Sequence, residues 1–105
     1  MLPISLKAIE AGASGIVVSN HGGRVLDQCT ATAEVLPEIV DTVKGKVKIF
    51  VDGGIRSGTD IFKALAIGAD GVLIARPYVT AVYSGGEEGV KVFTEKLVAD
   101  RKSVV

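Results

Sequence analysis

Three short polar clusters hold the residues of this sequence that could do chemistry. The first is SNHGGR, residues 19–24, which contains the only histidine of the chain, His21, three positions before Arg24. Imidazole exchanges protons near neutral pH and so suits proton abstraction, whereas a guanidinium suits a carboxylate. A lone histidine in a loop is more often a surface or structural residue, so this cluster by itself identifies no reaction.

The second cluster, DGGIRSGTD at 52–60, has the features of a phosphate site. Gly53 and Gly54 allow the backbone to pass close to a ligand and to point N–H groups at it. Arg56 adds a positive charge, and Asp52 can accept hydrogen bonds from sugar-like hydroxyl groups. The alternative is a plain tight turn, which this cluster taken alone fits equally well.

The third cluster, ARP at 75–77, supplies a second arginine. The guanidinium of Arg76 can donate two parallel hydrogen bonds to phosphate oxygens. Pro77 is placed to begin a short helix. Ser57 or Thr59 can cap the helix after the second cluster, and the N-terminus of that helix favours an anion. Arginines in both clusters favour a phosphate site over a plain turn.

Each cluster follows a short apolar run, which we expect to be a β-strand. The three runs are GIVVS (15–19), KIFVD (48–52) and GVLIA (71–75). Continuous apolar runs of this length are typical of parallel strands buried on both faces. The carboxyl ends of such strands are where ligand sites of α/β proteins gather, so the three clusters should meet at one edge.

Helical patterns alternate with these runs and predict the order α-β-α-β-α-β-α. They are found at 4–12, 31–44, 59–67 and 89–102. Pro37 is expected in the first turn of the second of these helices. AIEAGASGIVV (8–18) also matches ALAIGADGVLI (64–74), which predicts left-handed caps at Gly12 and Gly68. Alternation of this kind predicts parallel strands joined by right-handed crossovers.

Length and composition limit the remaining possibilities. The chain has 105 residues, 48% of them hydrophobic, and 12 basic residues balance 12 acidic ones, which argues against nucleic acid or a membrane as the main partner. The single cysteine, Cys29, cannot form an internal disulfide. With no signal-like or membrane-spanning segment and no metal-ligand pattern, we expect a soluble, cytoplasmic protein without a metal. A complete (β/α)8 barrel takes about 250 residues, so three strands make either a small open unit or a piece of a barrel.

Four segments decide between these two possibilities. SNHGGRVLD, PEIV, DGGIRSGTDIFKALAIGA and VLIARP resemble the FMN-dependent α-hydroxy acid oxidase and dehydrogenase family, which includes glycolate oxidase, lactate oxidase and flavocytochrome b2. The likeness runs from about residue 8 to about residue 98. It implies an α/β fold that is the C-terminal half of a TIM (β/α)8 barrel, with FMN as cofactor. SNHGGR is highly specific to this family, whereas other phosphate-binding barrels also carry turns like DGGIRSGTD.

The resemblance also implies a role for each matching residue. Ser19 would touch the flavin ring, His21 would be the active-site base, and Arg24 would bind the substrate carboxylate. The ribityl chain and phosphate of FMN would be lined by Asp52, Gly53, Gly54, Ile55, Arg56, Ala75 and Arg76. The implied reaction is the oxidation of a small L-2-hydroxy acid, such as lactate or glycolate, to the 2-oxo acid.

The sequence departs from the family pattern at two positions and in its extent. Val25 replaces the usual glutamine, and Ala75 replaces a usual glycine, where its methyl group is expected to crowd or shift the phosphate. The first five strands of the family, with the aspartate that orients the histidine, have no counterpart here. We therefore expect residues 1–105 to form a single partial domain that is inactive alone. Half a barrel leaves two sheet edges and an apolar face uncovered, so we also expect homo-oligomers. The alternative function is a noncatalytic flavin- or phosphate-binding half-barrel.

Overall fold

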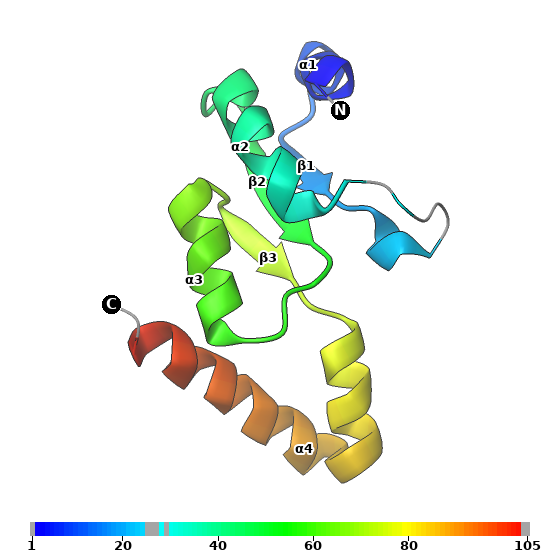
Figure 1. The fold of residues 1–105 in the computed structure, drawn as a ribbon, viewed down its shortest axis with the longest axis vertical. Coiled ribbons are helices and arrows are strands. Elements are labelled where there is room, and N and C mark those ends of the chain that lie inside the picture. Colours follow the sequence, from blue (N-terminus) through cyan, green and yellow to red (C-terminus); the bar gives the residue numbers. More distant parts are fainter. Residues whose placement is uncertain (1, 25–27, 29, 104–105) are drawn as a thin grey trace.

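The structure is a computed structural model that describes residues 2–24, 28 and 30–103. Its elements are α1 (Leu2–Glu10), β1 (Gly15–Val18), the 3-10 helix η1 (His21–Gly23), α2 (Thr32–Val43), β2 (Lys48–Asp52), α3 (Gly58–Ile67), β3 (Gly71–Leu73) and α4 (Arg76–Ser103). The predicted alternation of helices and strands is confirmed (Figure 1). Two positions discussed above, Val25 and Cys29, lie outside the described residues.

The three strands form one parallel sheet in the order β1-β2-β3. Ile16 pairs with Ile49 across the first ladder, and Val51 pairs with Val72 across the second. The strands lie where the apolar runs predicted them, although β1 and β3 end before Ser19 and Ala75. Because the strands are parallel, the polar clusters that follow them all leave the sheet at the same edge.

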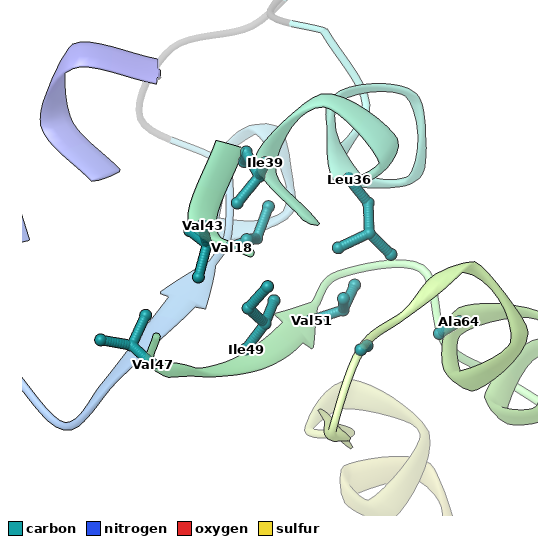
Figure 2. Packing of buried hydrophobic residues seen from close by; sticks show 9 residues of the cluster. Val18, Leu36, Ile39, Val43, Val47, Ile49, Val51 and Ala64 are labelled. Atoms are coloured by element: carbon teal, nitrogen blue, oxygen red, sulfur yellow. The ribbon is translucent and has the colours of Figure 1, made fainter. Parts of the chain in front are cut away.

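One face of the sheet carries the hydrophobic core, beneath α2 and α3 (Figure 2). Side chains of β1 and β2 meet the apolar stripe of α2 there. The fully buried members of this core are Val18, Leu36, Ile39, Val43 and Val51. This packing fixes the ends of β1 and β2 relative to each other, and the polar clusters are attached to those ends.

The described residues leave the opposite face of the sheet uncovered. Val17, Phe50 and Leu73 alternate with core residues along the three strands and are 54%, 37% and 41% exposed. The prediction of strands buried on both faces is therefore wrong for this chain, because its helices cover a single face. The expectation of an uncovered apolar face is confirmed.

Pro37 departs from its predicted place. It lies inside α2, which begins five residues earlier at Thr32, rather than in the first turn. Proline has no N–H and so leaves the carbonyl of Ala33, four residues before it, without its helical donor. The helix continues through this position because Leu36, Ile39 and Val43 are buried on either side of the proline.

Glycines allow the turns that return the chain from helix to strand. Gly12 and Gly68 both have positive φ, +88° and +131°, as their matching sequences predicted. At Gly68 the reason is also steric, because a Cβ would lie 2.6 Å from a methyl carbon of Val40. The helices α2 and α3 therefore approach each other closely beside the core.

The last helix, α4, bends at Gly86 into two arms that form a V (Figure 1). The arms contact each other through a hydrogen bond of 2.8 Å between the Tyr78 hydroxyl and Thr94 Oγ1. The ring of Tyr78 also meets Phe93 edge to face, with centroids 4.9 Å apart. Pro77 is the second residue of the first arm, as predicted.

The fold is more open than that of a compact domain of its length. Its radius of gyration is 15.0 Å, whereas about 13 Å is typical of 100 residues. Its accessible surface is 7078 Å², against roughly 5,600 Å² for a compact monomer of this mass. Among the described residues, no helix has the length and apolar character needed to cross a membrane.

Candidate functional site

A cavity of about 140 Å³ opens where β2 and β3 end. Eight of the ten residues singled out in the sequence line it: His21, Asp52, Gly53, Gly54, Ile55, Arg56, Ala75 and Arg76. Gly22, Leu73 and Pro77 complete the lining. The structure thus brings one histidine, one carboxylate and two guanidinium groups to a single small cavity, although they come from three separate segments.

Ser19 and Asp52 join the turn that carries His21, the histidine turn (residues 19–24), to the end of β2. The hydroxyl of Ser19 donates a hydrogen bond of 2.6 Å to Asp52 Oδ2. The Ser19 hydroxyl oxygen also accepts a hydrogen bond of 3.0 Å from the backbone N–H of His21. Ser19 itself does not line the cavity. The Ser19 hydroxyl therefore links the histidine turn to the carboxylate of Asp52.

Asn20, which the sequence analysis did not single out, supports the same turn. Its side-chain oxygen accepts a hydrogen bond of 3.0 Å from Gly22 N–H and so caps η1. A Cβ built on Gly53 would lie 3.3 Å from that oxygen, so Asn20 also packs against the turn after β2. The local signal was present in the sequence, because asparagine before glycines is typical of a turn closed by its own side chain.

The backbone of His21 is itself unusual. Its φ is +56°, in the left-handed region. Histidine is one of the residues that tolerates this region better than most, and such conformations gather at functional sites. The N–H of His21 is held by Ser19, and its carbonyl accepts a hydrogen bond of 3.2 Å from the N–H of Arg24.

Arg24, like Ser19, is a predicted residue that the structure leaves outside the cavity. It follows η1 as its C-cap, and its side chain is exposed. Arg24 lies three positions from His21 in the chain, but the cavity lining includes Arg56 and Arg76 and not Arg24. The two arginines of the second and third clusters are therefore the guanidinium groups that this site brings together.

Arg56 precedes a capped helix. Ser57 is the N-cap of α3, and its hydroxyl accepts a hydrogen bond of 3.2 Å from Asp60 N–H, so the cap is Ser57 rather than Thr59. The carboxylate of Asp60 in turn accepts a hydrogen bond of 3.1 Å from Arg56 N–H. The Asp60 carboxylate thus already supplies the negative charge that the N-terminus of α3 favours. A ligand phosphate would have to depend on the glycines and arginines instead.

Comparison with known proteins gives the family. Residues 5–105 match the family described as FMN-dependent dehydrogenase. A peroxisomal (S)-2-hydroxyacid oxidase of Arabidopsis thaliana is 56% identical over 87 residues, which are 83% of this chain and 24% of that protein. An L-lactate oxidase of a Nostoc strain is 58% identical over 84 residues, 80% of this chain and 23% of its own length.

Solved structures agree with this result. A crystal structure of mandelate oxidase with benzoyl-formic acid matches with a TM-score of 0.95 and 46% identity, over 98% of this chain and 31% of that one. The chain thus spans about a quarter of the length of the curated relatives it matches. The predicted fold class, an α/β fold with three parallel strands from the C-terminal half of a TIM (β/α)8 barrel, is confirmed. By its sequence match over residues 5–105 and by its fold, this chain belongs to the FMN-dependent dehydrogenase family.

Proposed function

We propose that this chain forms the FMN phosphate site and the base-bearing turn of an enzyme that oxidises a small L-2-hydroxy acid to the 2-oxo acid. The observation that carries the proposal is the cavity where His21 lies with Arg56 and Arg76. The relatives support the substrate class, because their names are those of 2-hydroxyacid and L-lactate oxidases. The cellular location stays a prediction, since the relatives include peroxisomal proteins.

The residues of the cavity fit the phosphate end of FMN. Gly53 and Gly54 have φ of +97° and +78°, and a Cβ on Gly54 would meet nothing within 4 Å, so space is open beside the backbone there. Arg56 and Arg76 supply positive charge. At about 140 Å³ the cavity is smaller than the roughly 300–1,000 Å³ of a drug-sized ligand site. It would hold the phosphate and leave the flavin ring to other surfaces.

The remaining roles are those that the family resemblance implies. FMN, when bound, would supply the acceptor for the two electrons that the hydroxy acid loses. The substrate C–H and O–H bonds would break and a C=O bond would form; His21 would take one of the two hydrogens as a proton, and FMN would be the acceptor of the second proton together with the two electrons. Arg24 would pair with the substrate carboxylate, Asp52 would accept hydrogen bonds from ribityl hydroxyl groups, and Ser19 would lie toward the flavin ring.

A noncatalytic flavin- or phosphate-binding unit is the second candidate. The size of the cavity favours it, as does the absence of Arg24 from the cavity lining. The chain would then bind the phosphate of FMN without holding a hydroxy acid against His21. The two candidates differ in a single observable property, which is electron transfer from the substrate.

Titration of the chain with FMN, followed by addition of L-lactate or glycolate without oxygen, separates the two candidates. Binding followed by loss of the visible flavin absorption supports the enzyme, and binding without that loss supports the noncatalytic unit. Riboflavin, which lacks the phosphate, and the Arg76→Ala variant are the matched controls. Equal affinity for FMN and riboflavin, or undiminished FMN binding by Arg76→Ala, would refute the proposed phosphate site.

A further inference from the structure

We propose that Gly22 is a positioning residue for Arg76, and that their contact couples the phosphate site to His21. This inference rests on the proposed role of Arg76 in phosphate binding. Gly22 lies in the histidine turn after β1, whereas Arg76 begins α4 after β3. Their contact therefore crosses the carboxyl edge of the sheet, past the end of β2 that lies between them.

The guanidinium of Arg76 occupies the place where a side chain of residue 22 would be. A Cβ built on Gly22 would lie 2.7 Å from Nη2, 3.0 Å from Cζ and 3.1 Å from Nη1 of Arg76. Three atoms of a planar group at nearly equal distances indicate that the guanidinium lies with its flat face toward this position. Gly22 also has a φ of +65°, so the absent side chain serves both the turn and the arginine.

Two side-chain hydrogen bonds hold the histidine turn in place. Asn20 Oδ1 accepts the N–H of Gly22, and Ser19 Oγ accepts the N–H of the neighbouring His21, each at 3.0 Å. The Arg76 side chain, by contrast, is long and ends in a rotatable guanidinium. A methyl group added at residue 22 would therefore displace the guanidinium of Arg76 more readily than the turn.

Coupling follows from this arrangement. An anion that binds Arg76 in the cavity would hold the guanidinium against Gly22, and would thereby restrict the turn that carries His21. Coupling between two sites is reciprocal. A side chain at residue 22 that excludes the Arg76 guanidinium from its place would therefore also lower the affinity of Arg76 for the anion. Phosphate occupancy and the position of the imidazole would then change together, although the phosphate need not touch the imidazole.

The single histidine makes the coupling measurable, because the imidazole signals in a proton NMR spectrum of this chain can come only from His21. The expected result is that inorganic phosphate and FMN each shift these signals in a saturable way, while riboflavin does not. In Gly22→Ala we expect phosphate affinity to fall about tenfold and the shift of the imidazole signals to diminish.

Gly45→Ala is the matched control for backbone strain. Gly45 has a φ of +77°, and a Cβ there would meet nothing within 4 Å, so alanine imposes a similar strain without displacing a neighbour. This variant should bind phosphate like the original chain. Arg76→Lys keeps the charge but removes the planar group. When Gly22→Ala is added to Arg76→Lys, it should lower phosphate affinity hardly any further, because the effects of contacting residues are not additive.

The outcomes separate this inference from the proposed function. Equal phosphate binding by Gly22→Ala and Gly45→Ala would overturn the positioning role and leave the phosphate site intact. FMN binding that leaves the His21 signals unmoved would overturn the coupling alone. An original chain that binds neither FMN nor phosphate would overturn the phosphate site and this inference together.

Discussion

Ser19 donates a hydrogen bond of 2.6 Å to Asp52 and joins the ends of two adjacent strands through their side chains. Because the same hydroxyl oxygen accepts the N–H of His21, one side chain determines both the carboxylate position and the course of the base-bearing turn. The two residues are 33 positions apart in sequence. This pair is therefore a feature of the folded chain and not of either cluster alone.

Replacing Ser19 by alanine should loosen the histidine turn. The N–H of His21 would lose its acceptor, which is worth about 1 kcal/mol for a typical hydrogen bond. Hydrogen–deuterium exchange at the His21 amide should then quicken by about fivefold. Ser19→Thr keeps the hydroxyl and should exchange like the original. An unchanged exchange rate in Ser19→Ala would show that Ser19 does not hold the turn.

Replacing Ala75 by glycine should strengthen FMN binding. The methyl group of Ala75 borders the cavity that we propose for the phosphate, at a position where the resembling family usually has glycine. The carbonyl of this residue also accepts the N–H of Tyr78 at 3.0 Å at the start of α4, where glycine is tolerated better than alanine. Affinity measured by flavin fluorescence should rise about threefold to tenfold, or by about 1 kcal/mol.

Ala75→Val tests the same idea in the opposite direction. The added methyl groups should reduce the space beside Arg76 and lower FMN affinity. If glycine and valine at position 75 gave the same affinity as alanine, crowding at this residue would be irrelevant to the cofactor.

Replacing Gly58 by alanine should destabilise the fold. Gly58 is buried at the start of α3, and a Cβ there would overlap Leu97 O, Asp100 Cβ and Arg101 N in the second arm of α4. Overpacking of this kind costs about 1–3 kcal/mol. The free energy of unfolding in urea should fall by that amount.

Gly85→Ala is the control for Gly58→Ala. A Cβ on Gly85 would meet nothing within 4 Å, and alanine is the better helix former, so this variant should be as stable as the original or more so. If the two alanine variants had the same stability, the close approach of α3 to α4 would not contribute to folding.

Placing a charge on the uncovered face of the sheet should reduce self-association. Val17 is 54% exposed beside Phe50 and Leu73, and an apolar face of this kind favours a second copy of the chain. Val17→Lys should weaken association about tenfold, since an apolar side chain of this size contributes about 1.5 kcal/mol when buried. Sedimentation across a concentration series measures the change.

Tyr83→Ser is the control for the uncovered face. Tyr83 is 94% exposed but belongs to the first arm of α4 and not to a strand of the sheet. Its replacement should leave the association constant unchanged. A larger effect from Tyr83 than from Val17 would place the contact between copies on α4 instead of the sheet.

The sequence by itself determined the strands, their parallel order and the polar cluster after each. These features depend on local chemistry. Apolar runs such as 48–52 form buried strands, and glycines such as Gly12 and Gly68 turn the chain from helix to strand. A resemblance carried by short motifs then placed FMN beside them. The family was recognisable because its motifs coincide with these local signals.

Only the tertiary structure decided which side chains of the clusters meet. Arg24 and Arg76 both follow the end of a predicted strand, yet of these two only Arg76 borders the cavity, against a glycine 54 positions away. The packing of Asn20 on Gly53 could not be read from the sequence either. Such contacts join residues far apart in the chain, so they depend on how helices and strands pack, which periodicity and turn chemistry do not specify.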